Sequence, residues 1–584
     1  MNDKLTSFLR GSLVVIGILV VFIGLKTSVE GIEHEKNVMK DLRFVTEINE
    51  AAFEFSAWEV QREKAYYMVL PIMFEKSEFA AEVSYDDRFY SVYIDDKIYQ
   101  NGDVWKDNLK EEVHTLKIED YFGNVRMEKP FQVLVSANVP AVMVTVEAKE
   151  ELLNRKEYAN KQYVEQGNVA IVDEDGSILL KDEMERFKVR GNLTSNMAKK
   201  PFTFTLSKEI SLFGMSASKN WHLLANATDG SHIRNAIMQG WAREMSDGYH
   251  PAGTWVDVFL NGEYQGLYFL TETIEISENR LNIDNENSVL LEMELDYRAV
   301  EEINYVNTEK EHYWVIHEDL PMSEEAKEEV KLYLDDIESA LYSEEGISEI
   351  SGHRLEELLD YDSWTDTWLL KEISSDHDLG TTSQFGVVED WKNRSILLAG
   401  PEWDFDGTLG NGMVPWAKNP RNLVTAIPNT KGIESVSQNK WLAQMYCHKE
   451  FKDLLVQKFQ TEVQPKIARL LEYEIDDYAE VIRRPALLDS LRWIGNNQYY
   501  YFTAPADFSL GNQEDYHKYD VLDSHVRMIK SFLVEKEQFL QELWVDGVEF
   551  EVIIEEHNEY GMSLDLNNDI YTWIPKETVS GNEK

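Results

Sequence analysis

Cysteine is almost absent from this sequence of 584 residues, which contains only Cys447. A single cysteine cannot form an internal disulfide, and it cannot supply the thiolates of a structural zinc cluster. Basic residues are also scarce, because 57 lysines and arginines face 106 aspartates and glutamates and leave a formal charge of −49. Since nucleic-acid backbones require clustered Lys and Arg, the sequence predicts no nucleic-acid partner.

Long apolar runs are lacking too, apart from residues 13–25, which carry no charge. A membrane-spanning helix needs about 17–25 residues. The run reaches that length only with its flanks, but no A-x-A cleavage site follows it. We therefore expect residues 1–30 to be an uncleaved N-terminal membrane anchor rather than a cleaved signal peptide. Because Lys4 and Arg10 precede the run and acidic residues follow it, the bulk of the chain is predicted to be extracytoplasmic.

The remaining chain is predicted to be an α+β protein built from successive segments. Residues 31–50 are polar and are expected to form a linker. Short alternating apolar runs with turn residues between them predict a small β-sandwich over 51–139. A longer mixed segment follows over 140–545, and residues 546–584 are left as a short C-terminal extension.

Several local signals lie within the long mixed segment. The dipeptides Asp175–Gly176 and Asn261–Gly262 each separate two apolar runs and predict β-hairpins. Residues 233–245 predict an amphipathic helix. Lys200 directly precedes an alternating strand, PFTFTL. From that position a lysine could reach nucleotide phosphates, or it could simply lie in solvent at the end of a strand.

Two spaced pairs of aspartates are the best candidates for chemistry, Asp376/Asp378 and Asp404/Asp406. A D-x-D pattern alone is weak evidence in so acidic a chain. The second pair, however, follows an apolar run at 396–399 and precedes glycines at 407, 410 and 412. Carboxylates are suitable ligands for Mg²⁺, and one from the first pair could accept a proton from an attacking hydroxyl.

In an extended segment, neighbouring side chains alternate between faces. Asp404 and Asp406 would then point toward a cleft, whereas Trp403 and Phe405 would point into the core. A calcium-binding EF-hand loop is excluded here, because its sixth and twelfth positions would need Gly and Glu but are Leu409 and Pro415. Two alternatives stay open at this point: a phosphatase, and phosphoryl transfer from a metal–nucleotide complex. The phosphatase arises because DFDGTLG resembles the first motif of haloacid-dehalogenase phosphatases, in which Asp404 would be the nucleophile.

Several ordered blocks between about Ala141 and Trp544 closely resemble the CotH family of spore-coat-protein-H-like kinases. The blocks are RGNLTS, KKPF, SLFGM, NWHLLAN, VDVFLNGEYQGLYFLTE and GPEWDFDGTLGN. The resemblance implies a divergent, atypical protein-kinase-like domain that binds ATP with Mg²⁺. It also implies phosphorylation of serine in secreted, cell-envelope or spore-coat proteins, for which Ser/Lys-rich partners are expected. With the preceding segments, the predicted architecture is a membrane anchor, a small β-sandwich and this kinase-like domain.

Matched positions within these blocks imply roles for individual residues. Asp378 corresponds to the catalytic base and Asp404 to the Mg²⁺ ligand, with Asp376 and Asp406 as further candidates for the metal. Lys200 corresponds to a lysine expected on the ATP phosphates, and Glu272 could pair with it as in ordinary kinases. The other matched positions are implied to shape the nucleotide pocket: Arg190, Asn192, Asn226, Asp229, Arg234 and Asn235.

The sequence also departs from the family pattern. Asp376 stands where asparagine is usual, and it adds a charge that a cation could compensate. Lys536 replaces an arginine, and threonines at 203 and 205 stand where basic residues are common. The first departure keeps open a catalytically impaired scaffold or assembly protein of the cell envelope. The phosphatase remains a lesser alternative, because the later G-D-x-x-x-D element of that class does not follow.

Overall fold

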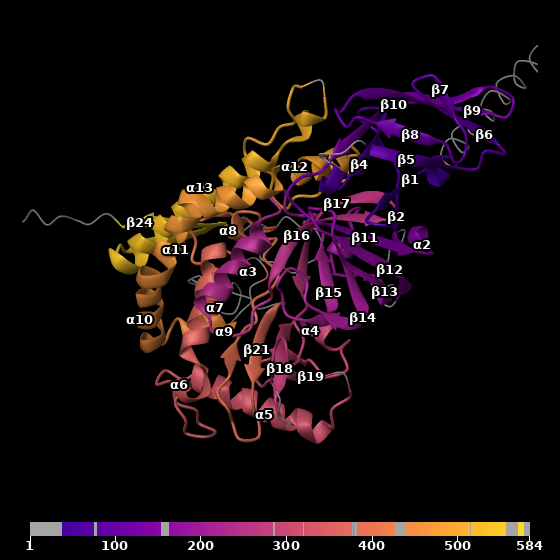
Figure 1. Cartoon of the computed structure of the whole chain (residues 1–584). Coiled ribbons are helices and arrows are strands. Elements are labelled where there is room, and N and C mark those ends of the chain that lie inside the picture. The colour runs from indigo at the N-terminus through magenta and orange to yellow at the C-terminus, as the bar shows by residue number, and fades with distance from the viewer. Residues whose placement is uncertain are drawn as a thin grey trace, which may run out of the picture.

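The computed structural model describes residues 38–576 except 75–78, 154–162, 284–286, 319, 377, 379–381, 427–439, 514 and 556–569. Helices and strands both make up large parts of it, so the predicted α+β class is confirmed. In Figure 1 the N-terminal strands lie at one end of the molecule, a β-barrel lies in the middle, and a second sheet with helix α5 lies at the opposite end.

The N-terminal strands form two sheets that share an aromatic core. The first has the order β2 (Ala51–Phe55), β1 (Arg43–Ile48), β5 (Phe79–Ser84), β8 (Val104–Asp107). The second has the order β3 (Trp58–Val60), β4 (Ala65–Leu70), β10 (Val125–Val135), β9 (Val113–Asp120), β6 (Tyr90–Ile94), β7 (Lys97–Tyr99). The ring centroid of Phe44 lies 5.3 Å from that of Trp105 and 5.8 Å from that of Phe131.

Strand β1 occupies residues 43–48 of the segment 31–50 that was expected to be a polar linker, and residues 31–37 lie outside the described residues. Phe44 and Ile48 are buried on one face of the strand, whereas Arg43 and Glu47 lie on the other. Residues 43–48 are therefore a half-buried strand, and their charged alternate residues gave them the composition of a linker. The N-terminal sheets also pack on the barrel, where the ring of Trp58 lies 5.9 Å from that of Tyr264.

Seven strands close into a barrel that is filled by apolar side chains. The phenyl rings of Phe187 and Phe202 stack there at 4.8 Å. The predicted hairpins at Asp175–Gly176 and Asn261–Gly262 are confirmed, as is the predicted helix, which is α3 (Arg234–Met245). The order around the barrel is β11 (Ala141–Val146), β12 (Glu165–Val172), β13 (Ile178–Val189), β14 (Phe202–Ile210), β15 (Ser218–Leu224), β17 (Glu263–Glu272), β16 (Gly253–Leu260).

A second sheet has five strands, and every pair within it is antiparallel. Dehalogenase-type phosphatases instead repeat βα units after their first motif. In the described part of the chain, helices rather than βα units follow Asp404, so the phosphatase alternative is not supported. The sheet order is β19 (Tyr305–Asn307), β20 (Tyr313–Ile316), β18 (Val289–Glu294), β21 (Gln384–Val388), β22 (Leu398–Ala399).

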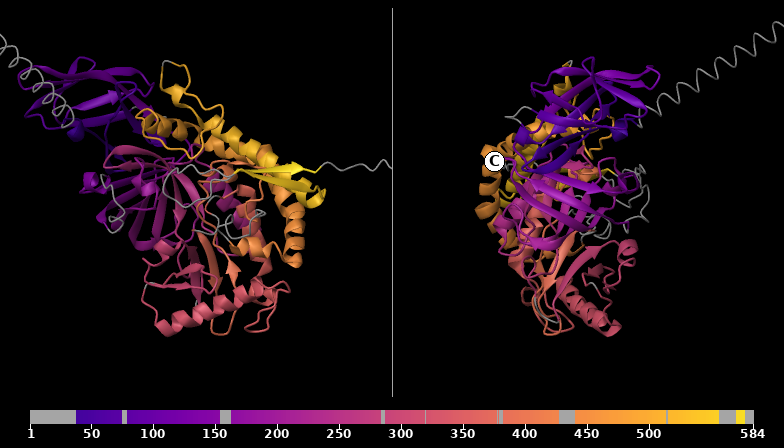
Figure 2. Two further views of the ribbon diagram at one scale, coloured as in Figure 1. Left: turned by 180° about the vertical axis from the view of Figure 1, so that it is seen from behind. Right: turned by 45° about the vertical axis from the view of Figure 1, so that its right-hand side comes forward.

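Helices surround these two sheets and complete the core. Figures 1 and 2 show α12 (Ile475–Trp493) and α13 (Leu522–Leu540) running along the upper side of the molecule. Helix α7 (Tyr361–Ser374) is deeply buried and leads directly to Asp376. The other helices are α2 (Lys149–Leu153), α4 (Asp296–Ala299), α5 (Glu324–Leu341), α6 (Leu355–Leu358), α8 (Pro415–Lys418), α9 (Lys440–Met445), α10 (Lys449–Lys458) and α11 (Gln464–Arg469).

The C-terminal segment ends in a hairpin of β23 (Phe550–Glu555) and β24 (Ile570–Pro575), whose Trp573 packs against Phe539 of α13.

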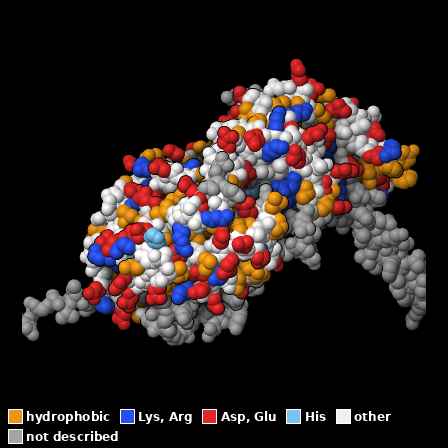
Figure 3. All heavy atoms as spheres, turned by 90° about the horizontal axis from the view of Figure 1, so that it is seen from below, with side chains coloured by type: hydrophobic (Ala, Val, Ile, Leu, Met, Phe, Trp, Pro, Cys, Tyr) orange, Lys and Arg blue, Asp and Glu red, His pale blue; other side chains and the backbone are white. Residues whose placement is uncertain are grey.

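The predicted localisation requires a correction. Among the residues that the structure describes, no helix is both long enough and apolar enough to cross a membrane. The anchor expected over residues 1–30 lies outside the described residues. We therefore withdraw the placement of the chain in a membrane. The face shown in Figure 3 carries acidic side chains scattered over its whole surface, in keeping with the strongly negative charge.

Candidate active site

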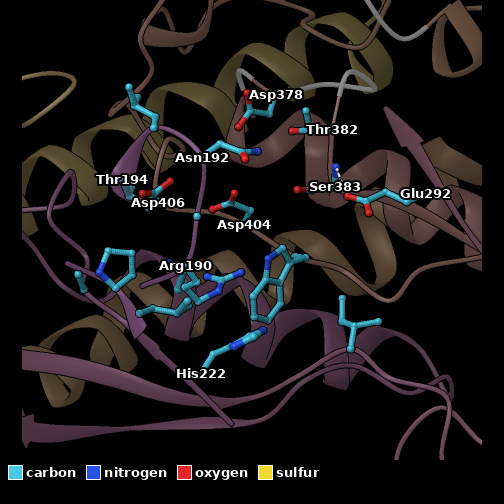
Figure 4. A pocket seen from close by; sticks show the side chains of 18 of the residues that line it. Arg190, Asn192, Thr194, His222, Glu292, Asp378, Thr382, Ser383, Asp404 and Asp406 are labelled. Carbon is cyan, nitrogen blue, oxygen red and sulfur yellow. Dashed lines mark hydrogen bonds between the residues drawn. The ribbon is translucent and has the colours of Figure 1, made fainter. Parts of the chain in front are cut away.

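A cavity of about 380 Å³ is lined by residues of the barrel and of the five-stranded sheet. The barrel contributes the segment after β13, from Arg190 to Thr194, and the end of β15. The second sheet contributes Glu292 and Glu294 of β18, and the segment after β22 contributes Trp403, Asp404 and Asp406. Figure 4 shows the carboxylates of Asp378, Asp404 and Asp406 around the same space as Arg190.

Most of the predicted site residues meet at this cavity although they are far apart in sequence. They are Arg190, Asn192, Asn226, Asn235, Asp378, Asp404 and Asp406. Of the described residues predicted for the site, Lys200, Asp229, Arg234, Glu272 and Asp376 do not line it.

The three aspartates concentrate negative charge at one side of the cavity. Burial raises the pKa of Asp404 well above its usual range, and the charges of Asp406 and Asp378 raise it further. The guanidinium of Arg190 opposes this shift, and it lies 5.5 Å from the ring centroid of Trp403. Such a set of carboxylates fits a divalent cation, because the cation would relieve their mutual repulsion.

No group of three or more His, Cys, Asp or Glu side chains in the described ranges could enclose a metal ion by itself. This finding is compatible with Mg²⁺, which usually takes one or two protein carboxylates and completes its octahedron with water and substrate phosphates. The donor set of this cavity therefore fits a metal–nucleotide complex better than an isolated, protein-enclosed metal.

The backbone at Asp404 differs from the extended segment that the sequence predicted. Asp404 has φ +67°, in the left-handed region, and residues 403–406 are not part of a strand. Both carboxylates still face the cavity, and Phe405 is buried as expected. Trp403 does not point away, however, but lines the cavity beside Arg190.

Residues of helix α3 form hydrogen bonds to the backbone of residues 405–409 and so hold the aspartate segment in place. The side-chain oxygen of Asn235 accepts a hydrogen bond from the Phe405 N–H at 2.9 Å. Arg234 is completely buried, and its guanidinium donates to the carbonyls of Thr408 at 2.8 Å and Leu409 at 3.2 Å. Asp229 forms an ion pair with this guanidinium. Arg234 is thus a brace for the aspartate segment rather than a ligand in the pocket.

Asp376 is likewise placed behind the cavity. It is 1% exposed, and its two oxygens accept hydrogen bonds from Lys371 Nζ at 2.8 Å and from the Asp378 N–H at 2.9 Å. Its carboxylate is therefore engaged by the protein, in contrast to the metal role expected for it. Lys371 supplies the cation that the unusual charge at position 376 requires.

The expected ion pair between Lys200 and Glu272 is not formed. Lys200 Nζ donates to the Ser195 carbonyl at 2.8 Å, which braces the segment that carries Arg190 and Asn192. The carboxylate of Glu272 accepts from the N–H groups of Ser216 and Ala252 instead. Along the barrel axis Lys200 lies near Tyr268 of β17, because the Tyr268 hydroxyl donates a hydrogen bond to the Lys200 carbonyl. Glu272 is four residues further along β17, which corresponds to about 13 Å of strand.

Several residues that line the cavity were missed by the sequence analysis. Glu292 and Glu294 are two residues apart in β18 and therefore lie on the same face of the strand. The signal that could have identified them is the pair of acidic residues within an apolar strand, LLEME. Burial raises the pKa of Glu294 to about 7, and nearby Glu292 adds to the shift. His222 also lines the cavity, and burial lowers its pKa well below the usual range.

Comparison with known proteins places the chain in a family. No curated protein matches the sequence. The model of one family, described as CotH kinase protein, matches residues 187–540. This range covers more than half of the chain and contains all the cavity residues named above. The chain therefore belongs to the CotH kinase protein family.

Proposed function

We propose that this protein is a Mg-ATP-dependent serine kinase of the CotH type, with a divergent kinase-like fold. The observation that carries the proposal is the single cavity in which Asp378, Asp404 and Asp406 meet Arg190. Phosphoryl transfer requires positioned phosphates and neutralised charge rather than a protein nucleophile. Carboxylates that hold a cation, together with a guanidinium, meet that requirement.

Different residues of the cavity would bind the metal ion, bind the ATP phosphates and accept the proton. Asp404 and Asp406 would hold Mg²⁺, whose positive charge would offset the negative charge of the phosphates of bound ATP. Arg190 would contact those phosphates, because its guanidinium lines the same cavity and interacts with the charges of both Asp404 and Asp406. Asp378 would accept the proton of the attacking serine hydroxyl. Asn192 and the backbone from Gly191 to Thr194 would enclose the nucleotide.

A serine-containing protein rich in lysine is the proposed substrate. Glu292 and Glu294 line the same cavity as Asp378 and extend its negative charge toward the second sheet. The chain as a whole carries a formal charge of −49. Charge complementarity of this kind speeds the encounter with basic partners and selects against acidic ones.

Phosphate transfer by the parent and by Asp378→Asn distinguishes a kinase from the alternative, a scaffold protein that has lost its activity. The parent should transfer label from ATP to a Ser/Lys-rich peptide in the presence of Mg²⁺. Asp378→Asn should still be stabilised by Mg-ATP, but its transfer rate should fall by about 10²–10⁴-fold, the usual contribution of a positioned base. Asp453→Asn, at an exposed site on α10, is the control. A parent that neither binds Mg-ATP nor transfers phosphate would leave the scaffold as the better explanation.

A further inference from the structure

The last turn of helix α7 contains a buried lysine whose partners lie beside both of the key aspartates. Lys371 is 1% exposed, and its ammonium lies 2.8 Å from Asp376 Oδ2 and 3.7 Å from Glu402 Oε2. Asp376 and Glu402 are themselves 1% and 2% exposed. Each of these carboxylates lies two residues before a cavity aspartate, Asp378 in one case and Asp404 in the other.

The contacts around Asp376 form a direct connection from Lys371 to the proposed base. One oxygen of Asp376 accepts from Lys371, and the other accepts from the Asp378 N–H at 2.9 Å. A carboxylate can serve two donors in this way because it has two acceptor oxygens, whereas an amide has only one. An asparagine at position 376 would therefore leave either Lys371 or the Asp378 N–H without its acceptor.

The contacts around Glu402 form the corresponding connection toward Asp404. Glu402 Oε1 accepts from the hydroxyl of Thr367, which is also on α7, and the Glu402 N–H donates to His250 Nδ1 at 3.0 Å. The ammonium of Lys371 also lies 4.9 Å from the ring centroid of Phe405. Lys371 thus contacts residues on both sides of Asp404 along the chain.

We propose that Lys371 is a positioning residue that fixes the base Asp378 relative to the metal ligand Asp404, and that Lys371 and Asp376 work only as a matched pair. This inference rests on the proposed kinase function. It predicts that asparagine, the residue expected from the family resemblance, lowers kcat when it replaces Asp376 while Lys371 is present. Removing both charges together should restore much of what either single change loses.

The test is a double-mutant cycle in the full chain with Lys371→Met, Asp376→Asn and the combined variant. Lys371→Met leaves two buried carboxylates without their cation, so kcat should fall by about 10²-fold, as expected when a catalytic group is misplaced by an ångström. The KM for ATP should stay within about threefold, because the nucleotide contacts are intact. Asp376→Asn should also lower kcat, and the combined variant should be at least about tenfold faster than Lys371→Met.

A matched control is available on the same helix. Lys458 of α10 forms a buried ion pair with Asp366 of α7 at 2.6 Å and a second pair with Asp362, whereas Lys371 contacts Asp376 and Glu402 beside the cavity aspartates. Lys458→Met should lower the melting temperature, as Lys371→Met does, because each leaves a buried carboxylate unpaired. Only Lys371→Met should change kcat, which separates a positioning role from a general loss of stability.

Each outcome has a distinct meaning. An active parent whose kcat is unchanged in Lys371→Met would overturn the positioning role alone. A combined variant that is no faster and no more heat-stable than Lys371→Met would overturn the matched pair, and this melting result needs no kinase activity. A parent that transfers no phosphate would overturn the proposed function and the role of Lys371 in it. Since the combined variant leaves only one buried carboxylate, Glu402, without its cation instead of two, it keeps the test informative if Lys371→Met fails to fold.

Discussion

Replacement of Asp404 by asparagine is the most direct test of the metal role assigned to the cavity. In the ligand-free protein the charges of Asp406 and Asp378 oppose ionisation of Asp404. Asp404→Asn replaces a carboxyl group whose ionisation these neighbours already oppose by a neutral amide of almost the same shape. The ligand-free variant should therefore melt at the same temperature as the parent or slightly above it. A carboxylate with a purely structural role would instead lower the melting temperature when removed.

With Mg-ATP present, the same variant should melt at a lower temperature than the parent, because it binds the ligand more weakly. A ligand present at about 100 times its Kd stabilises a protein by about 2.7 kcal/mol. If loss of the carboxylate raises Kd about 100-fold, the same concentration stabilises by only about 0.4 kcal/mol. Thermal melting with Mg-ATP, and with ATP plus a chelator, measures this difference. Asp453→Asn, which removes an exposed carboxylate, should behave like the parent. Equal stabilisation of Asp404→Asn and the parent would refute the metal role.

Two further predictions concern stability outside the cavity. Gly266→Ala should lower the melting temperature markedly, because Gly266 has φ +114° and an added Cβ would lie 2.1 Å from Asp489 Oδ2. Gly123→Ala has a similar backbone strain but open space, so a smaller loss there would isolate the clash. His114 lies 2.6 Å from both Asp95 and Asp107, and its pKa is raised from 6.5 to about 9. The ion pairs of protonated His114 stabilise the folded state by at most about 3 kcal/mol. This contribution should be complete below pH 6.5 and should be lost as pH rises through about 9. Melting of the parent against His114→Gln over that range checks it, and a constant difference would contradict the assignment.

Elements encoded by a few neighbouring residues could be predicted from the sequence. Asn261 and Gly262 adopt φ values of +50° and +79°, as a tight hairpin turn requires, and the turn connects the two predicted strands. The closure of the barrel could not be predicted in this way. It depends on parallel pairing of β11 with β16, which follows it only after four other strands. Local periodicity contains no information about such pairing.

The candidate site shows the same division between local and distant information. The D-x-D motif at Asp404 and Asp406 was found, and both carboxylates line the cavity. Their orientation was predicted from an extended backbone, whereas Asp404 has a left-handed conformation that depends on the turn around it. The pairing of Lys200 with Glu272 was inferred by analogy with other kinases. It fails because the register of β14, β15 and β17 separates the two residues along the barrel.

The departures from the family pattern gain a physical explanation only in the folded chain. Lys371 and Glu372 are consecutive on α7, and both are buried. Lys371 pairs with Asp376, where the family resemblance led us to expect asparagine, and Glu372 pairs with Lys536, where it led us to expect arginine. A buried charge without a partner is strongly destabilising, so each unusual residue is matched by an opposite charge on the same turn of one helix. Because stability alone requires both pairs, an inactive scaffold would keep them as well, and the kcat of Lys371→Met and Asp376→Asn is the measurement that separates a working enzyme from an impaired scaffold.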